Sequence, residues 1–230
     1  GVDFTLALPF DTNMANCTAD EFIDRILIGA LNISGVSIGH DFHFGKGRQG
    51  TPDMLQQRGA AAGFDVFITS AVVQADGQTP YSSSAIRALL RDAKVREAAT
   101  LMGHDWIIEG TVQHGDKRGR TFGFPTANME LIDSLQPPFG VYAARAEILS
   151  GPLQGQVHDG VANLGLRPTV GGTAPRLETH LFDFSGDLYD AELGVALTDF
   201  IRAEQKFDGI DALKAQIARD SQAARDIFAK

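Results

Sequence analysis

The pattern of apolar residues changes near residue 103, and this change restricts how each part of the chain can pack. Before it, strand-like and helix-like segments alternate: Phe4–Leu8, Thr18–Leu31, Gly35–Ile38, Pro52–Ala62 and Val66–Thr69. After it, short runs of β-branched and aromatic residues are separated by Gly and Pro. The first pattern indicates a parallel sheet with crossover helices, and the second indicates an antiparallel sandwich or barrel. We therefore predict an α/β domain over residues 1–103 and a β domain over residues 104–230.

The second domain is predicted to contain at least five strands: Trp106–Val112, Val141–Leu149, Gln156–Ala162, Leu177–Phe184 and Leu193–Ile201. In the second of them, Arg145 and Glu147 alternate with apolar residues, which is typical of a strand with one buried face. A terminal amphipathic helix is predicted from apolar residues at helical spacing, namely Leu213, Ile217, Ala224 and Phe228. We expect this helix to pack on its own barrel, and an oligomer contact remains the alternative.

Two helix starts in the first domain are marked by their own residues. Thr18 is followed three positions later by Glu21, which is a capping-box pattern. The tripeptide Thr51-Pro52-Asp53 supplies a cap, a proline at the first helical position and an acid in the first turn. We therefore predict that helices begin directly after Thr18 and after Thr51.

A third helix start, at Ser82-Ser83-Ser84, has two interpretations. The serines are good helix caps, and this simpler interpretation is favoured. Alternatively, hydroxyls and free N–H groups at the helix start join the guanidinium of Arg87, one turn later, around a phosphate. The string from Gly45 to Gly50 also has two interpretations. It matches the G-x-G-x-x-G pattern of a dinucleotide-binding fold, but the acid expected about 20 residues later, Asp65, sits at the beginning of its strand and not at the end where it would hold a ribose hydroxyl. A glycine turn is the simpler interpretation.

Composition narrows the classes of partner. The net charge of −9 argues against a general nucleic-acid binder, which would carry a basic patch. The single cysteine, Cys17, has no partner for an intramolecular disulfide, which fits a reducing compartment. No apolar run approaches the ~18 residues of a membrane span, and no signal peptide is visible. We expect a cytoplasmic protein that binds small molecules and neither nucleic acid nor membrane.

The stretch from Gly110 to Asn128 carries the most specific chemistry. It combines glycines that allow close backbone approach with cations suited to phosphate: Gly115, Gly119 and Gly123 with Lys117, Arg118 and Arg120. In an extended strand, Thr126 and Asn128 project a hydroxyl and an amide to one face. Their oxygens are ligands of the kind that Mg²⁺ takes. The stretch therefore predicts a phosphate and magnesium site, and the alternative is a basic hairpin followed by a turn.

This stretch resembles the signature of riboflavin kinases, in which a glycine-rich loop leads into Pro-Thr-Ala-Asn. Four further segments agree with that family in order along the chain: Val161–Thr169, Leu177–Leu181, Phe184–Tyr189 and Phe200–Phe207. The upstream part is similar to the adenylyltransferase half of the bacterial bifunctional riboflavin kinase/FMN adenylyltransferases, or FAD synthetases. The matching positions there are Gly39–Gly45, Arg48, Gly50 and Tyr81–Arg87. The resemblance covers nearly the whole chain.

The resemblance implies a partial Rossmann-like nucleotidyltransferase domain followed by an antiparallel Greek-key β-barrel with a C-terminal helix. It implies that ATP phosphorylates riboflavin to FMN, with a ribityl hydroxyl attacking the γ-phosphate. In this family Glu178 would be the catalytic base, and Thr126 and Asn128 would hold Mg²⁺. Flavin contacts would lie around Asn163–Thr169 and on the terminal helix.

The resemblance also assigns binding roles. Nucleotide-binding residues would be Gly115, Lys117, Gly119, Arg120, Gly123, Thr126 and Asn128, through a loop that closes over the phosphates. The remnant of the adenylyltransferase site would be Arg48, Ser83, Ser84 and Arg87. The family pattern Ile-Ser-Ser-Thr-x-Ile-Arg has become Tyr-Ser-Ser-Ser-Ala-Ile-Arg, which keeps a hydroxyl at Ser84.

One family motif is absent from the sequence. The first nucleotide-binding motif, which ends in His-x-Gly-His, would lie upstream of Gly1, and we interpret the chain as an N-terminally truncated piece of a longer frame. The adenylyltransferase step from FMN to FAD is therefore left open. Two other classes stay as alternatives: a catalytically inactive module that binds flavin or nucleotide, and a different nucleotidyl-transfer enzyme in which the barrel is an accessory.

Overall fold

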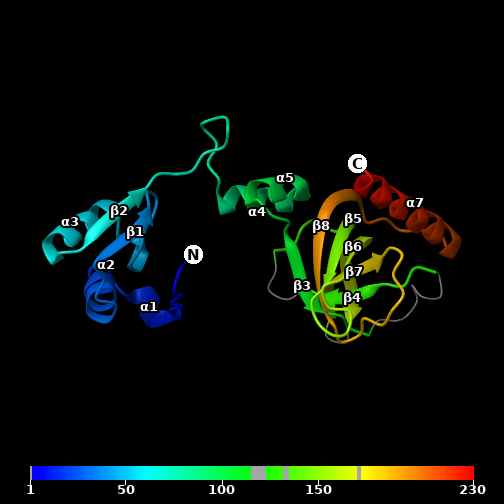
Figure 1. Ribbon diagram of the computed structural model, residues 1–230, viewed down its shortest axis with the longest axis horizontal. Coiled ribbons are helices and arrows are strands. Elements are labelled where there is room, and N and C mark those ends of the chain that lie inside the picture. The colour runs from blue at the N-terminus through cyan, green and yellow to red at the C-terminus, as the bar shows by residue number, and fades with distance from the viewer. Residues whose placement is uncertain (1, 115–122, 132–134, 170–171) are drawn as a thin grey trace. The chain divides into compact units, whose positions relative to one another are not determined.

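Two short parallel strands and one crossover helix form the centre of the first unit in the computed structural model (Figure 1). The structure describes residues 2–114, 123–131, 135–169 and 172–230, and the chain divides into the units Gly1–Tyr81 and Ser82–Lys230. Strand β1 (Gly35–Gly39) pairs in parallel with β2 (Asp65–Thr69). Helix α3 (Pro52–Ala62) connects the two strands. The predicted alternation of strand and helix is confirmed for this part.

The remaining helices of this unit are short: α1 (Thr12–Asn16), α2 (Ala19–Glu21), the π-helix η1 (Phe22–Ala30) and the 3-10 helix η2 (Lys46–Arg48). The predicted capping box is present, because Glu21 N donates to Thr18 Oγ1 at 3.2 Å and Thr18 N donates to Glu21 Oε2 at 2.8 Å. Thr51 Oγ1 accepts from Met54 N at 3.2 Å. Both predicted helix starts are therefore confirmed.

The predicted strand Phe4–Leu8 is wrong. These residues lie in an irregular segment, and Phe4 is 93% and Leu6 59% exposed. Alternating side chains form a strand only when a neighbouring strand supplies hydrogen-bond partners for the backbone. Within residues 2–81, β1 and β2 pair only with each other, so the segment has no partner strand.

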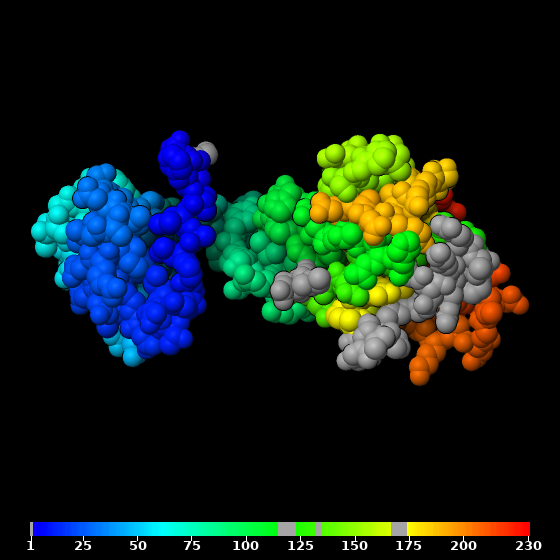
Figure 2. All heavy atoms as spheres, turned by 90° about the horizontal axis from the view of Figure 1, so that it is seen from below, coloured from blue at the N-terminus to red at the C-terminus, as the bar shows by residue number. Residues whose placement is uncertain are grey.

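Helices α4 (Ser83–Arg91) and α5 (Val95–Met102) belong to the second unit and pack against its barrel (Figure 2). Three of their apolar side chains are buried in the barrel core: Leu90, Val95 and Ala98. The predicted domain boundary between residues 103 and 104 falls inside this unit, which begins at Ser82. That boundary stays a prediction.

Six antiparallel strands form the barrel: β3 (Ile107–Thr111), β4 (Ala127–Glu130), β5 (Gly140–Ile148), β6 (Val157–Thr169), β7 (Gly172–Leu181) and β8 (Glu192–Ala203). They are hydrogen-bonded in the order β3-β8-β5-β6-β7-β4. The last strand returns to lie between β3 and β5, a long-range connection of the Greek-key type. Gln113 N donates to Asn128 O at 2.8 Å and links the two edges. The barrel is nearly closed, as predicted.

Side chains alternate between the barrel interior and an outer face that the C-terminal helix partly covers. On β7, Leu177 and Leu181 are buried in the interior, and the residues between them alternate in direction. Helix α7 (Ile210–Phe228) packs on the outer face. Its Ala224 belongs to a buried cluster with Val141 and Val161. The predicted packing of the terminal helix on its own barrel is confirmed.

Tyr142 places an ionisable hydroxyl inside the barrel. Its side chain is fully buried, and its hydroxyl donates to Pro138 O at 2.5 Å. Burial raises the pKa of Tyr142 to about 12, whereas an unfolded tyrosine has a pKa near 10. The neutral phenol therefore stabilises the fold fully below about pH 10. This contribution is lost as the pH rises towards 12, because the unfolded chain ionises first.

We predict that Tyr142→Phe flattens this alkaline loss of stability. At neutral pH the variant should be less stable by about 1 kcal/mol, because one buried hydrogen bond is lost. Between pH 10 and 12 its free energy of unfolding should fall less than that of the wild type. Urea unfolding at a series of pH values measures both effects, with the exposed Tyr81→Phe as the matched control. Equal slopes for wild type and Tyr142→Phe would contradict the prediction.

Candidate active site

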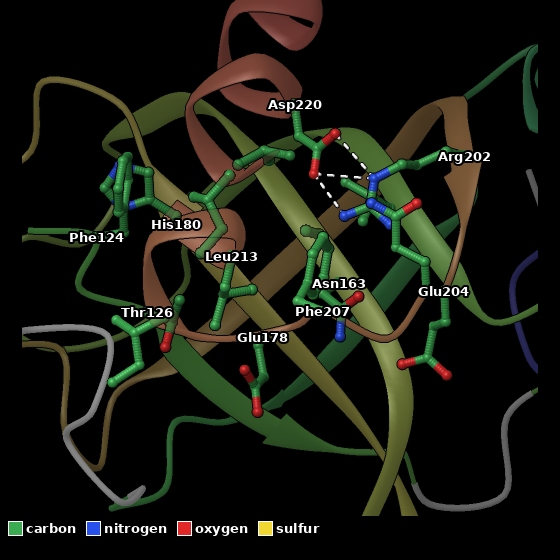
Figure 3. Close-up of a pocket in the computed structure, with 16 residues that line it drawn as sticks. Phe124, Thr126, Asn163, Glu178, His180, Arg202, Glu204, Phe207, Leu213 and Asp220 are labelled. Atoms are coloured by element: carbon green, nitrogen blue, oxygen red, sulfur yellow. Dashed lines mark hydrogen bonds and ion pairs between the residues drawn. The ribbon is translucent and has the colours of Figure 1, made fainter. Parts of the chain in front are cut away.

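A cavity of about 690 Å³ lies between the outer face of the barrel and helix α7 (Figure 3). Its apolar walls come from strands β5 and β6 and from α7: Val141, Val161, Leu213 and Ile217. Its polar lining includes Thr126, Asn163, Glu178, His180, Arg202, Glu204 and Asp220. Asn163 and the terminal helix, where flavin contacts are expected from the resemblance, thus line one cavity.

Strand pairing places the candidate base beside the candidate magnesium ligands. Glu178 on β7 lies directly opposite Asn128 on β4. Thr126 immediately precedes β4 and lines the same cavity as Glu178. The side chain of Asn128 turns back to Thr126, since its Nδ2 donates to Thr126 O at 3.1 Å and to Thr126 Oγ1 at 3.4 Å. The structure therefore brings these three residues together.

A second, smaller cavity of about 250 Å³ is also lined by Thr126. Its apolar lining comes from the ends of strands β3, β4 and β7 and from the loop before β8: Val112, Ala127, Leu181, Phe184, Leu188 and Tyr189. Thr126 lines both cavities. A group bound at Thr126 therefore borders both cavities and can contact a molecule in either one.

An ion pair crosses the upper side of the larger cavity. Arg202 on β8 donates to Asp220 on α7, with Nε 2.9 Å from Oδ1 and Nη2 2.6 Å from Oδ2. Gln216 Nε2 donates to the same carboxylate at 2.8 Å. The Asp220 side chain is only 5% exposed. The pair joins the helix to the barrel where both line the cavity (Figure 3).

Neither member of this pair was among the residues selected from the sequence. A signal for Asp220 was present, because it interrupts the apolar face of the terminal helix between Ile217 and Ala224. An acid on such a face needs a buried partner. Arg202 gave no comparable local signal, since arginine is common in exposed strands.

Much of the predicted glycine-rich loop lies outside the described residues: Gly115, Lys117, Gly119 and Arg120. Gly123, at the end of this loop, is exposed and has a φ of +86°, a conformation that suits glycine. Phe124 follows and lines the larger cavity beside Thr126. The nucleotide-binding role of the loop stays a prediction.

The four residues of the expected adenylyltransferase remnant fall in different units. Arg48 ends helix η2 in the first unit, where Gly45 and Gly47 have φ angles of 73° and 65°, in keeping with a glycine turn. Ser83, Ser84 and Arg87 lie at the start of α4, and Arg87 Nη1 donates to Ser83 Oγ at 3.0 Å. Ser82 caps the helix by accepting from Ala85 N. Capping thus involves Ser82, and the phosphate hypothesis for Ser83 and Ser84 stays a prediction.

The donor chemistry at Thr126 fits a hard cation held together with a substrate. Across the described parts of the chain, no three His, Cys, Asp or Glu side chains converge as a metal site would require. Thr126 and Asn128 instead carry a hydroxyl and an amide oxygen on adjacent side chains, and Mg²⁺ is often held by few protein groups with water and substrate phosphates. Of the helices that the structure describes, none has the length and apolarity to cross a bilayer.

Family models match both parts of the chain: riboflavin kinase over residues 102–228 and FAD synthetase over residues 1–85. A bifunctional riboflavin kinase/FMN adenylyltransferase of Escherichia coli (strain K12) is 45% identical over 99% of this chain and 71% of its own length. The chain belongs to this bifunctional riboflavin kinase/FMN adenylyltransferase family. Members from Pseudomonas fluorescens and Bacillus subtilis are 42% and 37% identical, over 100% and 99% of this chain and 72% and 71% of theirs.

A solved structure from Streptococcus pneumoniae, named as a macrolide-efflux protein, is also similar. It has a TM-score of 0.78 and 34% identity, over 94% of this chain and 67% of that one. The family and fold expected from the sequence are thus confirmed. The expected riboflavin kinase activity, with ATP and riboflavin as substrates and FMN as product, is confirmed as well. The alternative of an inactive binding module receives no support. The kinase match covers the barrel, which is therefore the riboflavin kinase domain of the chain.

Proposed function

We propose that the riboflavin kinase reaction of this chain takes place where the two cavities meet, with Glu178 as base and Thr126 and Asn128 as magnesium ligands. One observation carries this proposal: Glu178 and Thr126 line the same cavity, and Asn128 lies opposite Glu178 across the β4–β7 pair. A base, an oxygen-ligand pair and space for two substrates are the parts that phosphoryl transfer to a hydroxyl needs.

Riboflavin is assigned to the larger cavity. Its volume of about 690 Å³ lies in the ordinary range for small-molecule pockets. The walls from Val141, Leu213 and Ile217 suit an apolar ring system, and Asn163 and Glu204 supply polar groups for its edge. The ribityl chain would then extend towards Glu178, which shares this cavity.

ATP is assigned to the smaller cavity, with its terminal phosphate at Thr126. The apolar lining from Val112, Leu181 and Leu188 suits a nucleotide base. Because Thr126 belongs to both cavities, a phosphate there faces the space given to riboflavin. The glycine-rich loop, from Gly115 to Gly123, is proposed to cover the phosphates.

In the proposed step, a ribityl hydroxyl oxygen forms a bond to the γ-phosphorus while the bond to the bridging oxygen breaks. ADP leaves with that electron pair, and the carboxylate of Glu178 takes the hydroxyl proton. Magnesium bound with the substrate phosphates would neutralise their charge. Thr126 and Asn128 orient the γ-phosphate, and the cavity walls exclude water that would otherwise compete as acceptor.

We predict that Thr126→Val raises the Mg²⁺ concentration for half-maximal rate by at least about tenfold. Valine keeps the shape of threonine but removes the oxygen ligand and the partner of Asn128 Nδ2. FMN formation measured over a series of Mg²⁺ concentrations gives this value. Thr100→Val is the matched control, because its exposed hydroxyl donates to Arg96 O within helix α5. An unchanged Mg²⁺ requirement would remove Thr126 from the metal site.

The activity itself is tested by incubating the purified chain with riboflavin, ATP and Mg²⁺ and separating riboflavin, FMN and FAD over time. We expect FMN to accumulate and to require Mg²⁺. FAD in the same chromatogram reports separately on residues 1–103. A folded sample that forms no FMN would contradict the proposed function.

A further inference from the structure

The backbone pairing of β4 with β7 begins one residue after Thr126. The first pair in the ladder is Ala127 opposite Thr179, so Thr126 and Pro125 lie outside the strand without ladder bonds. Proline has no N–H to donate, and it ends strand pairing for that reason. The position of Thr126 in the site therefore depends on other contacts.

The side chain of His180 supplies a hydrogen bond to the chain at Pro125, just outside the ladder. Its Nδ1 lies 2.7 Å from Pro125 O, across 55 positions of sequence. A carbonyl oxygen only accepts, so Nδ1 carries the hydrogen and donates it. The ring is held on two sides, by Phe124 at 5.5 Å and by Phe182 at 5.9 Å between centroids, both edge-on. The hydrogen bond thus comes from a ring whose orientation is fixed.

This bond joins the two halves of the proposed reaction site. His180 lies two residues after Glu178, and both side chains line the larger cavity from β7 (Figure 3). Pro125 directly precedes Thr126, which Asn128 also contacts. The backbone of His180 pairs with Val161 on β6, and the approach is close, since a Cβ on the neighbouring Gly160 would lie only 2.4 Å from His180 O.

We propose that His180 is a positioning residue, whose Nδ1–H holds Pro125 and thereby sets the distance between Thr126 and Glu178. This inference rests on the proposed function, in which those two residues act on the phosphate and the hydroxyl. Misplacement of reacting groups by about 1 Å lowers the rate by on the order of 10²-fold. His180 contributes through this geometry and exchanges no proton with the substrates.

The test compares His180→Asn with His180→Gln. The amide nitrogen of asparagine occupies the place of Nδ1 and retains the donor to Pro125 O, whereas that of glutamine reaches the place of Nε2. His180→Ala is a second variant without the donor. His104→Gln is the matched control, since His104 is exposed and bonds only to the adjacent Asp105 O among the hydrogen bonds of the described chain. Fluorescence of the single tryptophan, Trp106, reports that each variant is folded.

We expect His180→Gln and His180→Ala to lower kcat for FMN formation by about 10- to 100-fold. The dissociation constant of riboflavin, from quenching of its fluorescence, should change less than about threefold. His180→Asn should recover kcat to within about threefold of the wild type, because the donor is restored. A structural role of the ring alone would not distinguish the two amides.

Two results would overturn this inference alone: a His180→Gln enzyme with the wild-type kcat, or equal losses in His180→Asn and His180→Gln. The second would show that ring packing, and not the hydrogen bond, matters. A wild-type chain that formed no FMN would overturn the proposed function and this inference together. The wild-type reaction run in parallel therefore distinguishes the two failures.

Discussion

Glu178→Gln is expected to lower kcat for FMN formation by about 10²- to 10⁴-fold, the range for loss of a general base. Glutamine preserves the shape of the side chain and its place opposite Asn128 on β4. It lacks the carboxylate that accepts the hydroxyl proton in the proposed step. Because shape is preserved, the affinities for riboflavin and ATP should change little.

Steady-state FMN formation gives kcat and KM, and riboflavin fluorescence gives binding without turnover. The matched control is Glu147→Gln, an exposed glutamate on strand β5, which we expect to retain the wild-type kcat. A Glu178→Gln enzyme with near-normal turnover would assign the base to another group. Loss of riboflavin binding with an unchanged kcat would instead make Glu178 a binding residue.

The fold was largely predictable because burial imposes a period of two on a barrel strand wherever one of its faces is exposed. In β5 the buried Ala144 and Ala146 alternate with the exposed Arg145 and Glu147, as their sequence indicates. The same alternation failed at Phe4–Leu8. A sequence pattern reports which face a strand would bury, but the strand also needs a neighbour to pair its backbone, and that neighbour is a tertiary property.

The site was predictable only in part. Spacing selected Thr126 and Asn128, resemblance to a family selected Glu178, and strand pairing places the three together. His180 is not predictable as a site residue, because its partner is the backbone carbonyl of Pro125. A backbone carbonyl exists at every residue, so it leaves no signal in the sequence. Such contacts are visible only once the register of two strands is known.

Asp220→Ala is expected to lower the free energy of unfolding of the second unit by about 3 kcal/mol. Removal of the carboxylate leaves the guanidinium of Arg202 without the acceptor for its Nε and Nη2 hydrogens. Breaking one partner of a buried pair costs roughly 3–5 kcal/mol. We expect the lower end of this range because the Arg202 side chain is 21% exposed, so water can solvate part of its unpaired charge.

The loss should come from the unpaired charge, and a double variant tests this cause. Arg202→Met with Asp220→Leu removes both charges, and we expect it to recover most of the stability lost in Asp220→Ala. Urea unfolding followed by Trp106 fluorescence reports on this unit, which contains the only tryptophan. Asp226→Ala on the same helix is the control and should change stability by less than about 0.5 kcal/mol, because Asp226 is exposed. If Asp220→Ala were as mild as Asp226→Ala, the pair would not be what fixes α7 to the barrel.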